Sequence, residues 1–194
     1  MAEYTPSTLP DPARSGSDTS RIFLTGFMGA GKSTVGPLVA ERLGYTFIDL
    51  DEAVAERAGQ PITVLFETGE DAFRALESTL LREVSQQDEV VVATGGGALA
   101  SETNLSLAQR AGVVVYLRVS VDALAHRLAD TATERPLLHD GEGRSLEGAA
   151  LKERIQALLD QRKLRYQQAD VVVDAEQEPE AVAFAIVDAL NAES

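Results

Sequence analysis

A glycine-rich segment near the start of the chain carries the residue types that hold phosphate groups. The segment follows a short apolar run and precedes a stretch with the spacing of a helix, and it fits the pattern G-x-x-x-x-G-K-[ST]: Gly26-Phe-Met-Gly-Ala-Gly31-Lys32-Ser33-Thr34. Glycines let successive backbone N–H groups surround a phosphate, Lys32 reaches the β- and γ-phosphates, and the Ser33 hydroxyl coordinates Mg²⁺. GTPases, ATPases, motor domains and small-molecule kinases share this pattern, so it predicts nucleotide binding without naming the acceptor. The predicted nucleotide ligands are Gly29, Ala30, Gly31, Lys32, Ser33 and Thr34.

Two carboxylates, Asp49 and Asp51, stand at the end of the next apolar run. Side chains alternate along a strand, so both are predicted to face one side at the C-terminal edge of a sheet, where ligands bind in open α/β folds. One carboxylate can support a metal ion while the other accepts hydrogen bonds from a substrate hydroxyl. Capping of a helix that starts near Glu52 is the alternative, and Asp51 could do this while binding substrate.

Two further groups have the chemistry of an acceptor site. Glu77 follows Arg74 by three residues, so its carboxylate can hold the guanidinium while the fork binds another carboxylate. Such a pair is also common on a solvated helix face. A later β-branched run ends in three glycines, which permit a close approach of backbone to ligand or form a plain tight turn: Gly95, Gly96 and Gly97.

These residues need a scaffold, and the hydrophobic pattern predicts an α/β fold with helices on both faces of a parallel sheet. Residues 130–148, with Pro136 and three glycines, predict a lid or binding loop. Short apolar runs predict five buried strands at 22–24, 46–48, 90–93, 113–117 and 171–173. Helical spacing predicts helices at 34–43, 71–84, 121–128, 151–166 and 180–190.

Length and charge restrict the function further. The 194 residues carry 17 basic and 31 acidic side chains, for a net charge of −14, and contain no cysteine. We expect a disordered tail over 1–20 and a single domain over 21–194. A surface so acidic disfavours nucleic acid, and no apolar run reaches the ~20 residues of a membrane span. We therefore expect a cytoplasmic, monomeric protein with small-molecule partners and without disulfides.

The motifs taken together resemble the shikimate kinase family of P-loop proteins. Five segments stand in the family's order and spacing: GFMGAGKST, FIDLDEAVAERAGQPI, FETGEDAFRALE, TGGG and ERPLL. The resemblance covers about residues 21–190. It implies a three-layer P-loop NTPase fold with a mobile lid. It also implies a kinase that uses ATP and Mg²⁺ to phosphorylate the 3-hydroxyl of shikimate, on the route to chorismate and the aromatic amino acids.

The resemblance assigns roles around the transferred phosphoryl group. Asp51 would bind the ring hydroxyls of shikimate and take the proton of the attacking 3-hydroxyl, and Asp49 would support Mg²⁺ through water. Arg135, in the ERPLL lid motif, would reach over the phosphoryl group when the lid closes. Lys32 and Arg135 would together stabilise its charge.

The resemblance also implies a carboxylate-binding end. Arg74, backed by Glu77, would pair with the shikimate carboxylate. A second arginine precedes a tyrosine in the family's late helix; here the pattern is Arg162-Lys-Leu-Arg-Tyr166, and we choose Arg162 over Arg165. Further substrate contacts are implied for Phe66, Phe73, Gly95, Gly96 and Gly97.

The chain departs from the family pattern around the adenine. The nearest candidate for the family's adenine-stacking arginine is Arg127, which needs a one-residue insertion to match. Where some members have an arginine two residues before a proline, this chain has Gln177 and Pro179. Two alternatives remain: a gluconate kinase-like enzyme and a non-catalytic nucleotide-binding module. The FRxxE helix disfavours the first, and the retained Lys32 and Arg135 disfavour the second.

Overall fold

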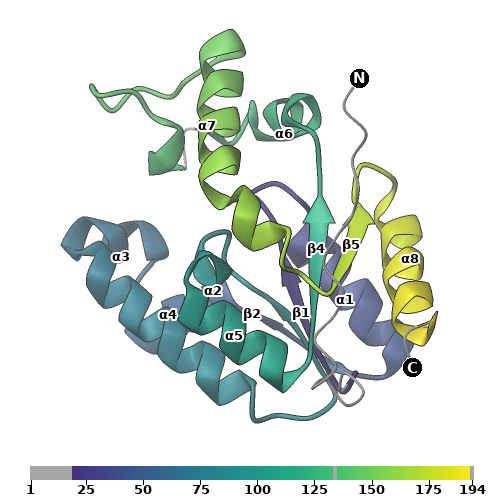
Figure 1. Cartoon of the computed structure of the whole chain (residues 1–194). Coiled ribbons are helices and arrows are strands. Elements are labelled where there is room, and N and C mark those ends of the chain that lie inside the picture. The colour runs from purple at the N-terminus through teal and green to yellow at the C-terminus, as the bar shows by residue number, and fades with distance from the viewer. Residues whose placement is uncertain (1–18, 133–134, 193–194) are drawn as a thin grey trace.

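Five parallel strands form one sheet at the centre of the protein (Figure 1). The computed structural model describes residues 19–132 and 135–192, with only the backbone for 66–68. The sheet order β2-β3-β1-β4-β5 places the first strand in the middle, which confirms the predicted parallel sheet. The strands are β1 (Arg21–Thr25), β2 (Thr46–Asp49), β3 (Val90–Ala93), β4 (Val113–Arg118) and β5 (Val171–Asp174). Residues 1–18 lie outside the described residues, so the predicted tail stays a prediction.

Helices cover both faces of the sheet, because side chains of successive strand residues point to opposite faces. Val91 packs into the core on one face and Val90 and Val92 into the core on the other. The first core receives α1 (Lys32–Leu43), α6 (Val121–Leu128), α7 (Gly148–Tyr166) and α8 (Pro179–Ala192). The second receives α2 (Leu50–Ala58), α3 (Ile62–Thr68), α4 (Glu70–Val84) and α5 (Glu102–Ala111). None of the described helices is long and apolar enough to cross a bilayer.

The two edge strands differ from the prediction that every strand is buried. In β5, Val171 and Val173 are buried whereas Val172 is 47% exposed. In β2, Thr46 is exposed and the other three residues are half-buried. Both strands lie at an edge of the sheet, where one side has no neighbouring strand in the described structure. The prediction of burial is therefore wrong for these two strands and confirmed for 22–24 and 90–93; in β4 it holds for every predicted residue but Tyr116, which is half-buried.

The predicted lid has more structure than a plain loop. Within 130–148, a short 3-10 helix η3 (Pro136–Leu138) buries Leu138 completely. The Asp140 carboxylate then accepts hydrogen bonds from the backbone N–H and the Nε of Arg144, both at 2.9 Å. Helix α7 begins at Gly148, three residues before its predicted start. The described part of this segment, residues 135–147, is an arm before α7 that lies at the upper left in Figure 1, beside α7.

Candidate active site

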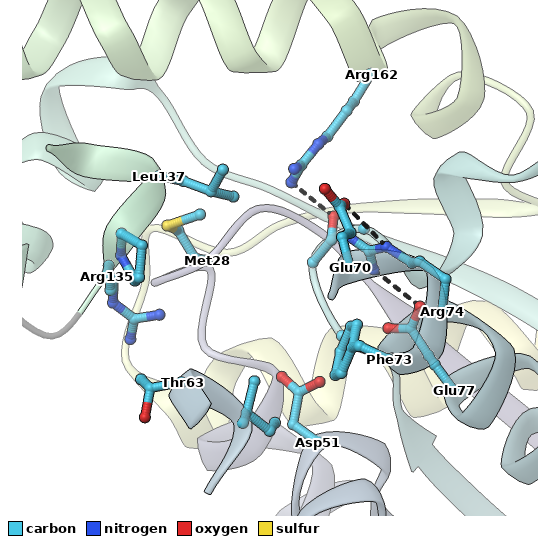
Figure 2. Close-up of a pocket in the computed structure, with 15 residues that line it drawn as sticks. Met28, Asp51, Thr63, Glu70, Phe73, Arg74, Glu77, Arg135, Leu137 and Arg162 are labelled. Atoms are coloured by element: carbon cyan, nitrogen blue, oxygen red, sulfur yellow. Dashed lines mark hydrogen bonds and ion pairs between the residues drawn. The ribbon is translucent and has the colours of Figure 1, made fainter. Parts of the chain in front are cut away.

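A cavity of about 230 Å³ lies where the carboxyl ends of the strands meet α4, α7 and the arm (Figure 2). Figure 2 shows Arg162 reaching in from α7, Arg74 from α4 and Arg135 from the arm, with the Asp51 carboxylate below them. The cavity thus brings together candidate residues that are far apart in the sequence. Those that line it are Asp51, Phe73, Arg74, Gly95, Gly96, Gly97, Arg135 and Arg162.

The glycine-rich loop between β1 and α1 has the backbone shape that the sequence predicts. Gly29 and Gly31 have φ values of 77° and 98°, in the left-handed region that favours glycine. Lys32 Nζ donates to the carbonyl oxygens of Gly26 and Phe27, each at 3.0 Å. Burial lowers the pKa of Lys32 to about 8, although nearby carboxylates oppose the shift. A partly desolvated ammonium at the start of a helix is well placed to bind phosphate oxygens.

Asp49 is the residue that caps the helix after β2. Its Oδ1 accepts from the backbone N–H of Asp51 at 3.0 Å, and α2 begins at Leu50. Its Oδ2 accepts from the Ser33 hydroxyl at 2.5 Å, so the two predicted metal ligands are in contact. The capping role considered for Asp51 is therefore wrong, because Asp51 already lies in the first helical turn. The prediction that Asp49 and Asp51 face one side of a strand is also wrong, since β2 ends at Asp49 and Asp51 belongs to α2.

The first turn of α2 aims Asp51 into the cavity. Burial and the neighbouring Asp49 raise the pKa of the Asp51 carboxyl, while Lys32, Arg74 and Arg135 counteract the rise. A carboxylate with a raised pKa is a stronger proton acceptor than an exposed one. Asp51 is thus a candidate base surrounded by cations.

Arg74 on α4 is held by carboxylates of its own helix. Its NH1 donates to Glu77 Oε2 at 2.9 Å, and its Nε and NH2 donate to Glu70 Oε1 at 3.4 and 3.2 Å. Glu77 is only 1% exposed, and its Oε1 has no hydrogen-bond partner among the described residues. Burial raises the pKa of Glu77, with Arg74 opposing the shift. The pair is therefore part of the cavity wall, and the alternative of a solvated helix face is wrong for Glu77.

The glycine turn after β3 passes directly beside these side chains. A Cβ atom on Gly95 would lie 2.5 Å from Asp51 Oδ1 and 2.8 Å from Glu77 Oε1. A Cβ atom on Gly97 would lie 2.9 Å from the NH2 of Arg74. Real Cβ atoms do not approach so closely, so a side chain at either position would displace the Asp51, Glu77 or Arg74 groups that line the cavity.

Arg162 on α7 approaches the cavity from the opposite side. Its NH1 donates to the Gly96 carbonyl oxygen at 2.8 Å, and its guanidinium lies 5.7 Å from the centroid of the Phe27 ring. Arg165, the other arginine of the motif, instead forms an ion pair with Glu102 at 3.2 Å on the surface. These positions support the choice of Arg162 as the substrate-binding candidate.

Arg135 stands at the start of η3, where the arm meets the cavity. Its Nε is buried and has no hydrogen-bond partner among the described residues. A buried guanidinium nitrogen without an acceptor favours an anionic ligand, because an unpaired buried donor is unfavourable.

A second cavity, of about 320 Å³, lies between the glycine-rich loop and the start of α8. Arg127 NH1 and NH2 donate to the carbonyl oxygens of Gly29 at 3.3 Å and Ala175 at 2.8 Å. The guanidinium therefore joins the glycine-rich loop to the segment after β5. The predicted nucleotide residues that line this cavity are Gly29, Ala30, Gly31, Thr34, Arg127 and Pro179.

Several residues of the first cavity were missed by the sequence analysis: Met28, Ile62, Thr63, Glu70, Pro136 and Leu137. Glu70 could have been found, since it precedes Arg74 by four residues, the spacing of a helical ion pair. Ile62 and Thr63 belong to α3, which was not predicted. The side chain of Phe66, a predicted substrate contact on α3, lies outside what the structure describes.

The parallel sheet, the glycine-rich loop at the start of α1 and the cation-lined acceptor cavity define a kinase of the P-loop NTPase fold. The shikimate kinase family model matches residues 28–191, and the chain belongs to this family. A shikimate kinase from Salinibacter ruber is 45% identical over 175 residues, which are 90% of this chain and 86% of the relative. The structure of shikimate kinase from Acinetobacter baumannii in complex with shikimate has a TM-score of 0.80 and 31% identity, with 91% of this chain and 95% of that chain covered.

The comparison with a gluconokinase bears on the alternative enzyme class. The gluconokinase structure from Sinorhizobium meliloti covers 91% of this chain and 94% of its own, with a TM-score of 0.58 and 21% identity. At that identity the likeness shows a shared fold alone. The gluconate kinase alternative is therefore less supported than shikimate kinase.

Proposed function

We propose that this chain transfers the γ-phosphoryl group of ATP to the 3-hydroxyl of shikimate and releases shikimate 3-phosphate and ADP. The observation that carries the proposal is the cavity that joins one carboxylate, Asp51, to guanidinium groups from two opposite walls. A hydroxylated carboxylic acid fits this arrangement, because its carboxylate can bind the guanidinium groups and its hydroxyl can bind Asp51. The family membership supports ATP as co-substrate and the route to chorismate as the pathway.

The two arginines would bind the acid end of the substrate. Arg74 and Arg162 line the same cavity from α4 and α7, on either side of the glycine turn. A guanidinium binds a carboxylate through paired N–H donors, which fixes orientation as well as charge. The Phe73 ring beside Arg74, 5.0 Å from the guanidinium carbon, would give the substrate ring an apolar surface.

Asp51 would act on the hydroxyl end. Its carboxylate would accept a hydrogen bond from the 3-hydroxyl and orient that oxygen toward the γ-phosphorus. As the new P–O bond forms, the bond between the γ-phosphorus and the bridging oxygen breaks, and ADP leaves with that electron pair. The hydroxyl proton passes to Asp51, whose raised pKa favours this transfer.

Lys32 and Arg135 would stabilise the negative charge of the phosphoryl group during its transfer. The charges of both residues influence the pKa of Asp51, which puts these cations close to the proposed base. The Ser33 hydroxyl and the Asp49 carboxylate provide hard oxygen donors of the kind Mg²⁺ takes, with water and phosphate oxygens completing its shell. When bound, Mg²⁺ would offset phosphate charge. The adenosine end would lie in the cavity between Arg127 and Pro179.

We further infer that residues 21–194 act as one kinase domain, as a monomer in the cytoplasm. One continuous sheet carries both cavities, and described residues of a single chain provide all the cations named above. The net charge of −14 disfavours nucleic acid, whereas a small anion meets only the cationic cavity.

A coupled assay of ADP release with shikimate, quinate and gluconate tests the proposal. We expect ADP release that depends on shikimate and that Lys32→Ala abolishes. Turnover with gluconate in preference to shikimate would contradict the proposed substrate. ATP binding without turnover of any of the three would favour a non-catalytic module.

A further inference from the structure

The phenol of Tyr166 forms a link to the proposed substrate site. Tyr166 ends α7, four residues after Arg162, so both side chains project from the same face of the helix. Its hydroxyl donates to the Gly96 carbonyl oxygen at 3.0 Å. Arg162 NH1 donates to that same oxygen at 2.8 Å. One carbonyl, with two lone pairs, therefore accepts from both side chains.

The ring of Tyr166 is fixed by packing. It is 3% exposed and stacks on the ring of Tyr116 from β4, with centroids 4.7 Å apart and planes 11° from parallel. Burial raises the pKa of the Tyr166 hydroxyl, while Arg162 lowers it through its charge and a hydrogen bond. The hydroxyl therefore remains protonated near neutral pH and stays a donor to Gly96.

The Gly96 carbonyl differs from its neighbours in what orients it. The carbonyl oxygens of Gly95 and Gly97 accept from the backbone N–H groups of Ala98 and Ala100 at 3.0 and 3.1 Å, whereas that of Gly96 accepts from the two side chains of α7. A long arginine side chain loses considerable rotamer freedom when it is held in one position. A second donor that fixes the shared carbonyl would reduce the freedom still to be lost when Arg162 binds a ligand.

We propose that Tyr166 is a positioning residue, which holds the Gly96 carbonyl and thereby presents the Arg162 guanidinium to the carboxylate of the substrate. The inference rests on the proposed function, since it takes that carboxylate as the ligand of Arg162. Tyr166 acts only through Gly96 and Arg162. Its hydroxyl therefore affects the binding of shikimate and leaves the binding of ATP unchanged.

Tyr166→Phe tests this role, because it removes the hydroxyl and keeps the stacked ring. A hydrogen bond of this kind contributes enough to raise the KM for shikimate by about 3- to 10-fold. The KM for ATP, kcat and the melting temperature should stay close to wild type. Tyr116→Phe, which removes the hydroxyl of the other ring in the stack, is the matched control and should leave both KM values unchanged.

A double-mutant cycle separates positioning from a general structural role. In an Arg162→Ala background, Tyr166→Phe should cause no further loss of kcat/KM for shikimate. An equal loss in both backgrounds, an unchanged KM in Tyr166→Phe, or a joint rise of both KM values with a lower melting temperature would each overturn the inference. Wild-type enzyme in the same assay shows separately whether shikimate is a substrate, so failure of the proposed function is distinguishable.

Discussion

The two walls of the acceptor cavity hold their arginines in different ways. On α4, Arg74 is paired with two carboxylates, Glu70 and the buried Glu77. On α7, Arg162 is held by the neutral carbonyl of Gly96. Arg74 is therefore held by charged partners on its own helix, whereas Arg162 is held by a neutral partner on another segment. The comparison suggests that Arg74 serves both folding and binding, and that Arg162 serves binding.

Replacing Arg74 should have the largest effect. Arg74→Ala removes a proposed carboxylate ligand and leaves Glu77 buried without its partner. We expect a rise of about 100-fold in the KM for shikimate, and a fall of about 2 kcal/mol in the free energy of unfolding, a value reduced because Arg74 is one-third exposed. Steady-state kinetics and denaturant unfolding measure both. An unchanged stability would show that Glu77 does not depend on Arg74.

Replacing Arg162 should affect binding alone. Arg162→Ala leaves a neutral carbonyl that still accepts from Tyr166, so the free energy of unfolding should fall by less than about 1 kcal/mol. The KM for shikimate should rise by about 30-fold, far more than the KM for ATP. Arg165→Ala, which removes an arginine of the same helix that pairs with Glu102 instead of lining the cavity, is the control. Similar rises in both KM values would place the carboxylate site elsewhere.

Glu77 should make the α4 wall sensitive to pH. Its pKa is raised above the ordinary 4.5, so folding favours the protonated form. Burial of the protonated Glu77 therefore stabilises the fold fully below pH 4.5, and this stabilisation is lost as the pH rises through the raised pKa. Glu77→Gln resembles the protonated acid and lacks this loss. The unfolding free energy of the wild type minus that of the variant should therefore decrease as the pH rises above 4.5. A constant difference would argue against a raised pKa.

Glu70 should have the smallest effect. Its side chain is 64% exposed and contacts the Nε edge of Arg74, where we expect it to compete with the carboxylate of the substrate. Glu70→Gln should lower the KM for shikimate about 2-fold and leave stability nearly unchanged, because exposed ion pairs contribute little. A higher KM would mean that Glu70 orients Arg74 instead of competing for it.

The sequence predicted best those features that are local in the chain. The five strands and the pairing of Arg74 with Glu77 follow from short-range patterns. Helix α5 was missed, and only three of its residues are buried. Helix α2 was expected only as a helix that starts near Glu52, and it begins two residues earlier, with Leu50 and Val54 as its buried residues. Their stability comes from packing on the sheet, which a local pattern does not encode.

The geometry between segments could not be read from the sequence. Asp51 and Glu77 converge on Gly95 from two different helices, so a side chain there would displace their carboxylates. The shared carbonyl of Gly96 likewise joins α7 to a turn that is remote in sequence. Such contacts depend on how the helices pack, so the family resemblance could suggest the residues without showing what holds them.

We expect Arg74 and Arg162, on opposite walls of the cavity, to bind the carboxylate of the substrate together. The most direct test compares kcat/KM for shikimate with that for its methyl ester, in the wild type and in Arg162→Ala. We predict that the wild type prefers the acid by about 100-fold and that Arg162→Ala loses most of this preference. Equal use of acid and ester by the wild type, or an undiminished preference in Arg162→Ala, would contradict the claim.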